Sequence, residues 1–191
     1  VRDGDTSNDG TLSLTFTASE ATTDFAVADI SVINGELSNF ATTSSTVYTA
    51  TFTPSGAGAT TIDVASSTFT DAAGNNNIAA TQFNWTYDGT APTMAITASE
   101  VSDGDTSNDG TLSLTFTSSE STSNFVVGDI TVNGGALSSF AGSGTTYTAT
   151  FTPTDDGATT IDVASSKFTD ATGNDNVAAT QFNWTYESQL P

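Results

Sequence analysis

Apolar and polar residues alternate along most of this chain, and no stripe with the period of an α-helix is present. In residues 11–17, Leu12, Leu14 and Phe16 face one side of an extended strand, and the Thr and Ser residues between them face the other. Residues 82–87 alternate in the same way. Thr, Val, Phe and Tyr are favoured in half-buried strands. The pattern therefore predicts an all-β protein.

Turn signals divide the chain into short strands. Asn34-Gly35, the Pro-Ser-Gly of residues 54–56 and the Ala-Gly-Asn of residues 73–75 each separate two alternating segments. Short strands with such punctuation every 8–12 residues or so are typical of a β-sandwich.

The sequence is also repeated. Residues 3–17, DGDTSNDGTLSLTFT, recur unchanged as residues 103–117, and TQFNWTY of residues 81–87 recurs as residues 180–186. A period near 100 residues is the size of a small domain rather than of a solenoid unit. We predict two tandem immunoglobulin-like Greek-key β-sandwiches, formed by residues 1–88 and 89–191.

In the second copy we expect the seven strands of such a sandwich. Their predicted ranges are residues 93–99, 111–117, 125–132, 136–140, 145–152, 158–164 and 177–186. The first copy begins at Val1, which aligns with Val101, and therefore has no counterpart of the segment Met94 to Glu100. We expect this domain either to be truncated or to have its edge completed by a neighbouring chain, because an uncovered edge strand is prone to pairing.

Composition excludes several functions. The chain has no Cys and no His, which excludes disulfides, Cys/His zinc sites and Ser-His-Asp triads. Its 22 acidic and two basic residues give a net charge of −20. Such a charge repels nucleic acids and anionic membranes. No apolar run approaches the length of a membrane span. We expect no nucleic-acid partner, no membrane insertion and a monomeric chain.

The motifs TFTxSE, FxVxDI, YTATFTP and FTDAxGN occur in this order in both copies. Together they resemble the bacterial Ig-like domains that are repeated in large surface adhesins and biofilm-associated proteins. The resemblance implies an extracellular rod of many such domains on the bacterial cell surface, with neighbouring repeats as partners. It also implies calcium at loops and at domain junctions.

The first candidate site is an acidic loop that is present in both copies. Calcium takes six to eight oxygen ligands, and three carboxylates within seven residues could supply part of that shell. A solvated turn is the alternative, since Asp, Asn and Gly favour turns without a metal. The carboxylates are Asp3, Asp5 and Asp9 in the first copy and Asp103, Asp105 and Asp109 in the second.

The second candidate site follows from the expected topology. In an immunoglobulin-like sandwich, the loop after the second strand and the loop between the last two strands lie at the same end. This brings Glu120 and Asp170 towards the linker residue Asp88, and the first copy offers Glu20 and Asp71. The resemblance implies calcium here, and an Asx turn is the alternative for the loops that carry Asp71 and Asp170.

We expect no enzymatic activity. Isopeptide formation finds too little support because the first copy lacks Lys, and glycosidase chemistry because the acidic residues lie in repeated turns. Ice binding by outward-facing Thr finds too little support because Thr is common on any solvated strand face. The expected function is that of a structural spacer in an adhesin, stiffened and stabilised by calcium. The alternative is a carbohydrate-binding module that uses the aromatic face of Phe83, Trp85 and Tyr87 or of its repeat, with a glycan as ligand.

Overall fold

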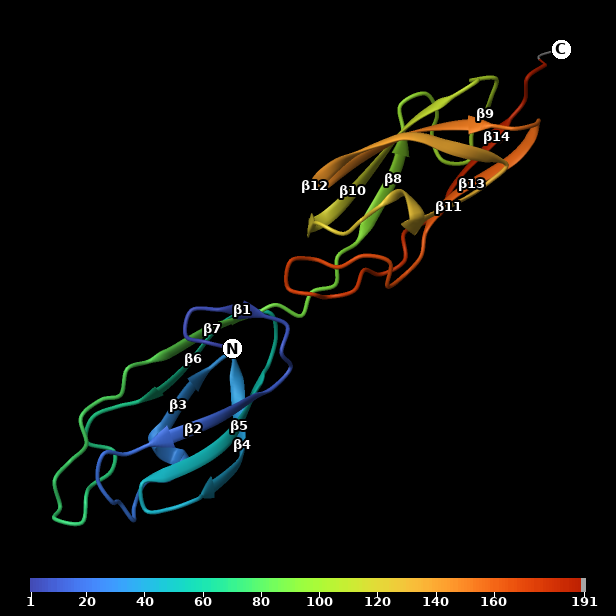
Figure 1. Cartoon of the computed structure of the whole chain (residues 1–191). Helices are drawn as coiled ribbons and strands as arrows, with labels where there is room; N and C mark the ends of the chain where they lie inside the picture. The colour runs from blue at the N-terminus through green and yellow to red at the C-terminus, as the bar shows by residue number, and fades with distance from the viewer. Residues whose placement is uncertain (190–191) are drawn as a thin grey trace. The chain divides into compact units, whose positions relative to one another are not determined.

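The computed structural model describes residues 1–189, which divide into two compact units, residues 1–90 and the described residues from 91 onwards. Each unit contains two β-sheets and one short 3-10 helix (Figure 1). The predicted all-β class with two immunoglobulin-like domains in tandem is confirmed.

The second domain has a three-stranded sheet in the order β12-β10-β8 and a four-stranded sheet in the order β11-β13-β14-β9. All strand pairs are antiparallel except β14 with β9. The strands are β8 (Met94–Ala98), β9 (Thr106–Ser107), β10 (Leu112–Thr122), β11 (Ile130–Asn133), β12 (Gly135–Pro153), β13 (Gly157–Val163) and β14 (Phe182–Tyr186).

The first domain repeats the four-stranded sheet of the second domain, but its three-stranded sheet is built differently, with β4 and β5 in place of the single run β12. Its sheets have the orders β2-β5-β4 and β1-β7-β6-β3, so β2 is an edge strand. Among residues 1–90, no strand takes the place that β8 has in the second domain. The strands are β1 (Thr6–Ser7), β2 (Leu12–Thr17), β3 (Ile30–Ile33), β4 (Gly35–Thr42), β5 (Val47–Pro54), β6 (Gly58–Val64) and β7 (Phe83–Tyr87).

Several predicted strand limits are wrong. The strand expected over residues 125–132 begins only at Ile130, because a 3-10 helix (Val127–Asp129) precedes it and Asp129 Oδ2 accepts a hydrogen bond from the Val126 N–H at 2.9 Å. The last strand begins at Phe182 rather than at residue 177. The two strands expected over residues 136–140 and 145–152 form one run, β12.

The short strands β1 and β9 were not predicted. They lie in the acidic loops and pair in parallel with the last strand of their domain. This pairing is supported by hydrogen bonds from the Gly104 N–H to the Asn183 carbonyl at 2.7 Å and from the Thr185 N–H to the Asp105 carbonyl at 2.9 Å.

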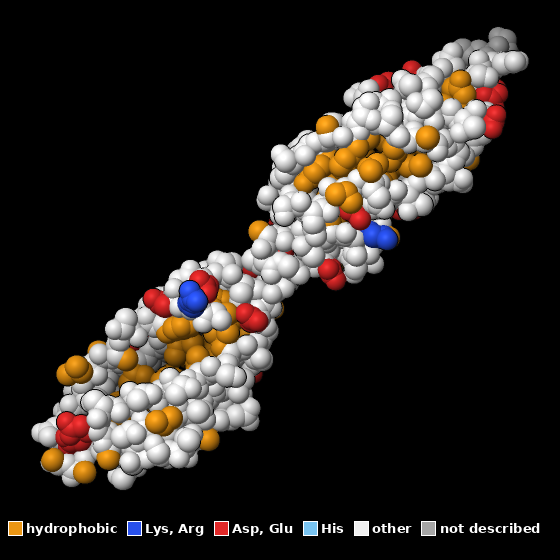
Figure 2. Space-filling model, viewed as in Figure 1, with side chains coloured by type: hydrophobic (Ala, Val, Ile, Leu, Met, Phe, Trp, Pro, Cys, Tyr) orange, Lys and Arg blue, Asp and Glu red, His pale blue; other side chains and the backbone are white. Residues whose placement is uncertain are grey.

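Aromatic side chains fill the space between the sheets. Phe125 contacts the rings of Phe116, Tyr147 and Phe168 with centroid distances of 5.9, 5.1 and 5.2 Å. Trp184 packs edge-on against Phe151, and the two side chains are 1% and 0% exposed. Figure 2 shows acidic side chains on both domains and a strip of apolar side chains on the viewed face of each.

A buried tyrosine hydroxyl makes the same hydrogen bond in each domain. The Tyr147 hydroxyl donates to the Thr122 carbonyl at 2.9 Å, and the Tyr48 hydroxyl donates to the Thr22 carbonyl at the same distance. Both tyrosines are almost fully buried. In the second domain the bond ties the end of β10 to β12, and in the first domain it ties the segment after β2 to the start of β5.

We predict that Tyr147→Phe destabilises the second domain by about 1–3 kcal/mol, since the Thr122 carbonyl loses its buried donor while the ring still fills its place. Urea unfolding followed by Trp184 fluorescence in a Trp85→Phe background measures this loss. Tyr186→Phe, which changes a partly buried ring, serves as the control. A loss below about 0.5 kcal/mol for Tyr147→Phe would contradict the prediction.

Candidate functional site

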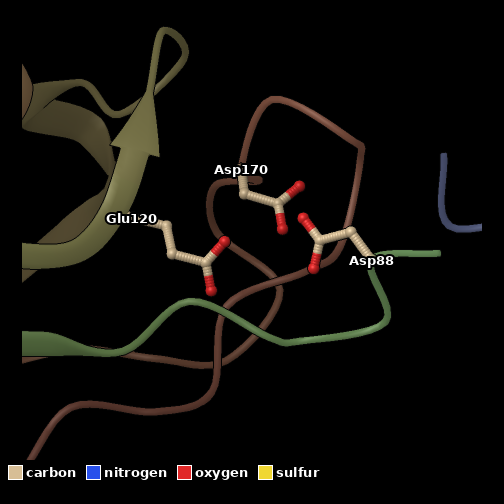
Figure 3. A group of neighbouring side chains, drawn as sticks. All are labelled: Asp88, Glu120 and Asp170. Carbon is tan, nitrogen blue, oxygen red and sulfur yellow. The ribbon is translucent and has the colours of Figure 1, made fainter. Parts of the chain in front are cut away.

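Three carboxylates of the sequence-predicted set meet in the structure. Asp88, Glu120 and Asp170 each place one carboxylate oxygen within 4.8 Å of the others. Figure 3 shows the three side chains pointing towards one another, from the segment before β8, from the end of β10 and from the loop between β13 and β14. Within residues 1–189, this is the one group of three or more acidic side chains that is close enough to share a metal ion.

Asp170 is fixed by the loop that it begins. Its Oδ1 accepts hydrogen bonds from the backbone N–H groups of Thr172, Gly173 and Asn174 at 2.7–2.9 Å. Gly173 has a φ of +95°, a conformation that favours glycine. The expected Asx turn is therefore present.

The Asp170 side chain is ionised at neutral pH although it is only 7% exposed. Burial raises its pKa, but hydrogen bonds from Asn174 and Thr172 outweigh burial and hold the pKa below its ordinary value. Asn174 Nδ2 donates to Oδ2 at 2.8 Å. The loop thus holds a negative charge in a defined position.

A buried asparagine, Asn176, is hydrogen-bonded to four backbone groups at the two ends of this loop. Asn176 is 2% exposed, its Oδ1 accepts from the N–H groups of Lys167 and Phe168, and its Nδ2 donates to the carbonyls of Ala164 and Val177. These bonds tie the segment after β13 to the segment before β14. The sequence analysis did not identify this residue.

Glu120 owes its position to strand β8. Pairing with β8 continues β10 through Ser118, which lies opposite Met94, and the Ser119 N–H donates to the Thr93 carbonyl at 2.9 Å. The segment before β8 also contacts the loop that carries Asp170, because the Val177 N–H donates to the Pro92 carbonyl at 3.1 Å. Strand β8 therefore brings the end of β10 and this loop to the same place.

Asp88 lies in the connection between β7 and β8. Its Oδ1 accepts a hydrogen bond from the Thr90 N–H at 3.2 Å, which forms a short turn in the connection. The side chain is partly buried. With Glu120 and Asp170 it gives a set of hard oxygen donors whose charges repel one another unless a cation or protons lie between them.

The first domain has only part of this arrangement. Asp71 accepts hydrogen bonds from the N–H groups of Ala73 and Asn75 and from Asn75 Nδ2, and Gly74 has a φ of +87°. Hydrogen bonds from Asn75 lower the pKa of Asp71, as in the second domain. The structure does not bring Glu20 and Asp71 into a group of three carboxylates among the residues that it describes.

The acidic loops hold their carboxylates apart. Asp103 Oδ1 accepts from the Asn183 N–H at 2.6 Å, and Asp105 Oδ2 accepts from the Ser102 N–H at 2.7 Å. Asp109 Oδ2 accepts from the Ser107 hydroxyl at 2.7 Å.

The first copy repeats these bonds. Asp3 accepts from the Asn84 N–H, Asp5 from the Arg2 N–H and Asp9 from the Ser7 hydroxyl. In both copies the three carboxylates therefore fasten the loop to itself and to the last strand. Calcium binding by these loops stays a prediction.

In each domain one short polar side chain, Asp24 or its counterpart Asn124, joins two loops by hydrogen bonds. The sequence analysis did not identify these two residues. Asp24 accepts hydrogen bonds from the Thr22 hydroxyl at 2.7 Å and from the N–H and hydroxyl of Thr70 at 3.1 and 2.8 Å. In the second domain Asn124 accepts from the Thr122 hydroxyl and from the Thr169 N–H. The available signal is a Thr followed two residues later by Asp or Asn in both copies.

The aromatic residues of the last strand belong to the core. Trp85 and Trp184 are each 1% exposed, and each indole N–H donates to a Ser hydroxyl of the acidic loop, at 3.2 and 3.0 Å. These rings do not form an exposed platform on which a sugar could stack.

Comparisons with known proteins agree with the fold. A family model described as a bacterial Ig-like domain matches residues 1–87 and again residues 88–186. No protein with a curated description matches the sequence. Among residues 1–189, no helix has the length and the apolar character needed to cross a membrane.

Solved structures with a similar arrangement are distant. InvD of Yersinia pseudotuberculosis is 20% identical with a TM-score of 0.40, and the match covers 98% of this chain and 58% of InvD. The adhesin InvE of the same species is 14% identical with a TM-score of 0.31, covering 96% of this chain and 56% of InvE. A glucan-bound Bacteroides ovatus protein, SGBP-B, is 16% identical with a TM-score of 0.27, covering 95% of this chain and 43% of that one. The chain thus spans less than two thirds of each, and at these scores the likenesses carry no argument about function.

Asp24 of the first domain is replaced by Asn124 in the second, and this predicts that the two domains differ in their sensitivity to acid. Hydrogen bonds from Thr22 and Thr70 lower the pKa of Asp24, so its stabilising effect is present above about pH 4 and is lost as the pH falls through the folded-state pKa. We expect Asp24→Asn to reduce the loss of first-domain stability between about pH 4 and pH 2.

Thermal unfolding followed by Trp85 fluorescence, in a Trp184→Phe background, measures this effect. Asn124→Asp is the matched control and should make the second domain more acid-sensitive. Parallel pH curves for Asp24→Asn and the unchanged chain would show that the carboxylate has no such role.

Proposed function

This chain belongs to the bacterial Ig-like domain family, and we propose that its two domains form part of a structural spacer in a bacterial cell-surface adhesin. The observation that carries the proposal is that one family model matches the chain twice in tandem, over residues 1–87 and 88–186. Repetition of a stable sandwich lengthens a protein without adding chemistry. The proposal includes an extracellular location and no enzymatic activity.

We also propose that calcium binds at Asp88, Glu120 and Asp170. Calcium prefers carboxylate, amide and carbonyl oxygens, and all donors at this site are oxygens. The Asp170 loop is already ordered by its own hydrogen bonds, so little conformational freedom is lost on binding. Rotation of the Asn174 side-chain amide by half a turn would exchange its nitrogen and oxygen and present Oδ1 to the same ion. A bound cation would offset the mutual repulsion of the three carboxylates.

Stiffening of the connection follows from the place of Asp88. Only residues 88–93 separate β7 from β8, and the Asp88 N–H donates to the Ser7 carbonyl at 3.0 Å. A cation that binds the Asp88 carboxylate together with Glu120 and Asp170 would restrict rotation about this short connection. Without the cation, repulsion among the carboxylates would favour a more mobile connection.

The carbohydrate-binding alternative has no comparable support. It depended on exposed aromatic side chains, and Trp85 and Trp184 are buried in the two cores. We therefore propose the spacer function alone.

We predict that excess calcium raises the thermal midpoint of the chain relative to EDTA, whereas magnesium does so much less. A ligand that binds only the folded state stabilises it by about 2.7 kcal/mol at a hundredfold excess over its Kd. Glu120→Gln and Asp88→Asn should remove most of this rise. Asp105→Asn is the matched control and should retain the rise, since Asp105 lies in the acidic loop and outside the carboxylate group.

Equal stability in calcium and EDTA would contradict calcium binding. Loss of the rise in Asp105→Asn, with no loss in Glu120→Gln, would assign the ion to the acidic loop instead. Small-angle scattering of the same samples tests the stiffening, which predicts a narrower distribution of maximum dimensions in calcium. An unchanged distribution would leave calcium as a stabiliser without a mechanical role.

A further inference from the structure

The two-residue strand β9 pairs in parallel with β14, the last strand of the second domain. Thr106 lies opposite Thr185, and Ser107 lies opposite Tyr186. In their sheet β14 has β13 on one side and β9 on the other, so β9 forms an edge (Figure 1). The other strand pairs described for this domain are antiparallel. The parallel pair therefore joins an early strand of the domain directly to its last one.

The parallel direction determines how this pair responds to a pulling force. The chain enters β9 at its amino end and leaves β14 at its carboxyl end, and in a parallel pair these are opposite ends of the pair. Tension along the chain therefore pulls β9 and β14 in opposite directions along their common axis. In this geometry all the hydrogen bonds between the strands carry the load together. Strands that are pulled apart from one end lose their bonds one at a time.

Backbone hydrogen bonds join β14 to β9 and to the loop before it at three successive positions. They are Gly104 N–H to the Asn183 carbonyl at 2.7 Å, Thr185 N–H to the Asp105 carbonyl at 2.9 Å, and Glu187 N–H to the Ser107 carbonyl at 3.0 Å. Both partners advance along the chain from one bond to the next, so the bonds lie side by side and share a load along the strands. Residues 103–107 and 183–187 thus form one unit, the parallel junction.

Two side chains of the acidic loop strengthen the parallel junction. Asp103 Oδ1 accepts from the Asn183 N–H at 2.6 Å, and the Ser107 hydroxyl accepts from the Trp184 indole N–H at 3.0 Å. Trp184 is only 1% exposed, and its carbonyl accepts from the buried Thr159 hydroxyl at 2.9 Å. The side chain of Ser107 is therefore fastened to the core of the domain as well as to the neighbouring strand.

The first domain contains the same junction, in which β1 pairs in parallel with β7. Its bonds are Gly4 N–H to the Asn84 carbonyl at 2.7 Å, Thr86 N–H to the Asp5 carbonyl at 2.9 Å, Asp88 N–H to the Ser7 carbonyl at 3.0 Å, Asn84 N–H to Asp3 Oδ1 at 2.7 Å and Trp85 Nε1–H to Ser7 Oγ at 3.2 Å. Residues 3–17 and 103–117 are identical. The duplicated acidic loop thus carries a complete junction in each domain.

We propose that the parallel junction is the force-bearing element of each domain, and that Asp103 and Ser107 help to set the tension at which the second domain gives way. It acts without calcium, because its bonds run between protein groups. The use of such an element rests on the proposed spacer function, whereas resistance to force is a property of each domain. The two can therefore fail separately.

The test applies force to the full chain in two directions. The chain has no Cys, so two engineered thiols define the points of attachment. Ser102→Cys with Gln189→Cys loads the junction along its strands, and Ser102→Cys with Thr180→Cys separates the same strands from their amino ends. All three positions are exposed. In optical tweezers and EDTA, the force at the first rupture should be severalfold higher for the first pair of thiols than for the second.

Variants in the first pair of thiols test the individual bonds. Asp103→Ala and Ser107→Ala each remove a side-chain acceptor, Glu187→Pro removes a backbone donor, and each should lower the rupture force. Asp103→Asn keeps an acceptor oxygen and should retain most of the force. Tyr147→Phe is the control outside the junction: it should lower stability in urea and leave the rupture force unchanged, because forced unfolding follows the unfolding rate rather than the equilibrium stability.

Two results would overturn the proposal. Equal rupture forces in the two directions would show that the junction does not bear the load. Unchanged forces in Asp103→Ala, Ser107→Ala and Glu187→Pro, with a lowered force in Tyr147→Phe, would place the resistance in the core instead. Either result would still be compatible with a spacer, whose resistance would then come from core packing.

Discussion

The pairing of β8 with β10 is the contact on which the second domain depends. It covers one edge of the aromatic core, and it continues β10 to Thr122, whose carbonyl accepts the buried hydrogen bond of Tyr147. The segment before β8 also binds the loop between β13 and β14 through the Pro92 carbonyl. Core closure and the position of the acidic group are therefore consequences of the same strand.

The first domain shows what the same sequence does without that strand. Its β2 ends at Thr17, its core residues Leu14 and Phe16 are partly exposed, and Glu20 is exposed. The loop around Asp71 nevertheless keeps the turn of its counterpart, because its hydrogen bonds are local. Local contacts thus build each carboxylate loop, while gathering the carboxylates requires contacts between distant segments.

This distinction also explains how far the sequence alone predicts the protein. Alternation and turn residues predicted the sandwich, and the duplicated motifs predicted two domains, because these patterns reflect local geometry and burial. The roles of Asp103 and Asn124 were not predictable, since each depends on a partner more than 40 residues away, at Asn183 and Thr169. For the same reason, only three of the eleven acidic candidates lie together in the described part of the structure. The expected order of strands and loops predicted this group, whereas the spacing of acidic residues along the sequence did not.

The most direct test of the account is a calorimetric titration of the chain with calcium after removal of all divalent ions. The account predicts one specific site per chain, because only the second repeat combines Asp88, Glu120 and Asp170, and it predicts that Asp88→Asn abolishes this site. Two equivalent sites, one for each repeat, would show that the local loops bind calcium without the gathered carboxylates. No measurable heat of binding, with unchanged unfolding, would contradict the calcium site altogether.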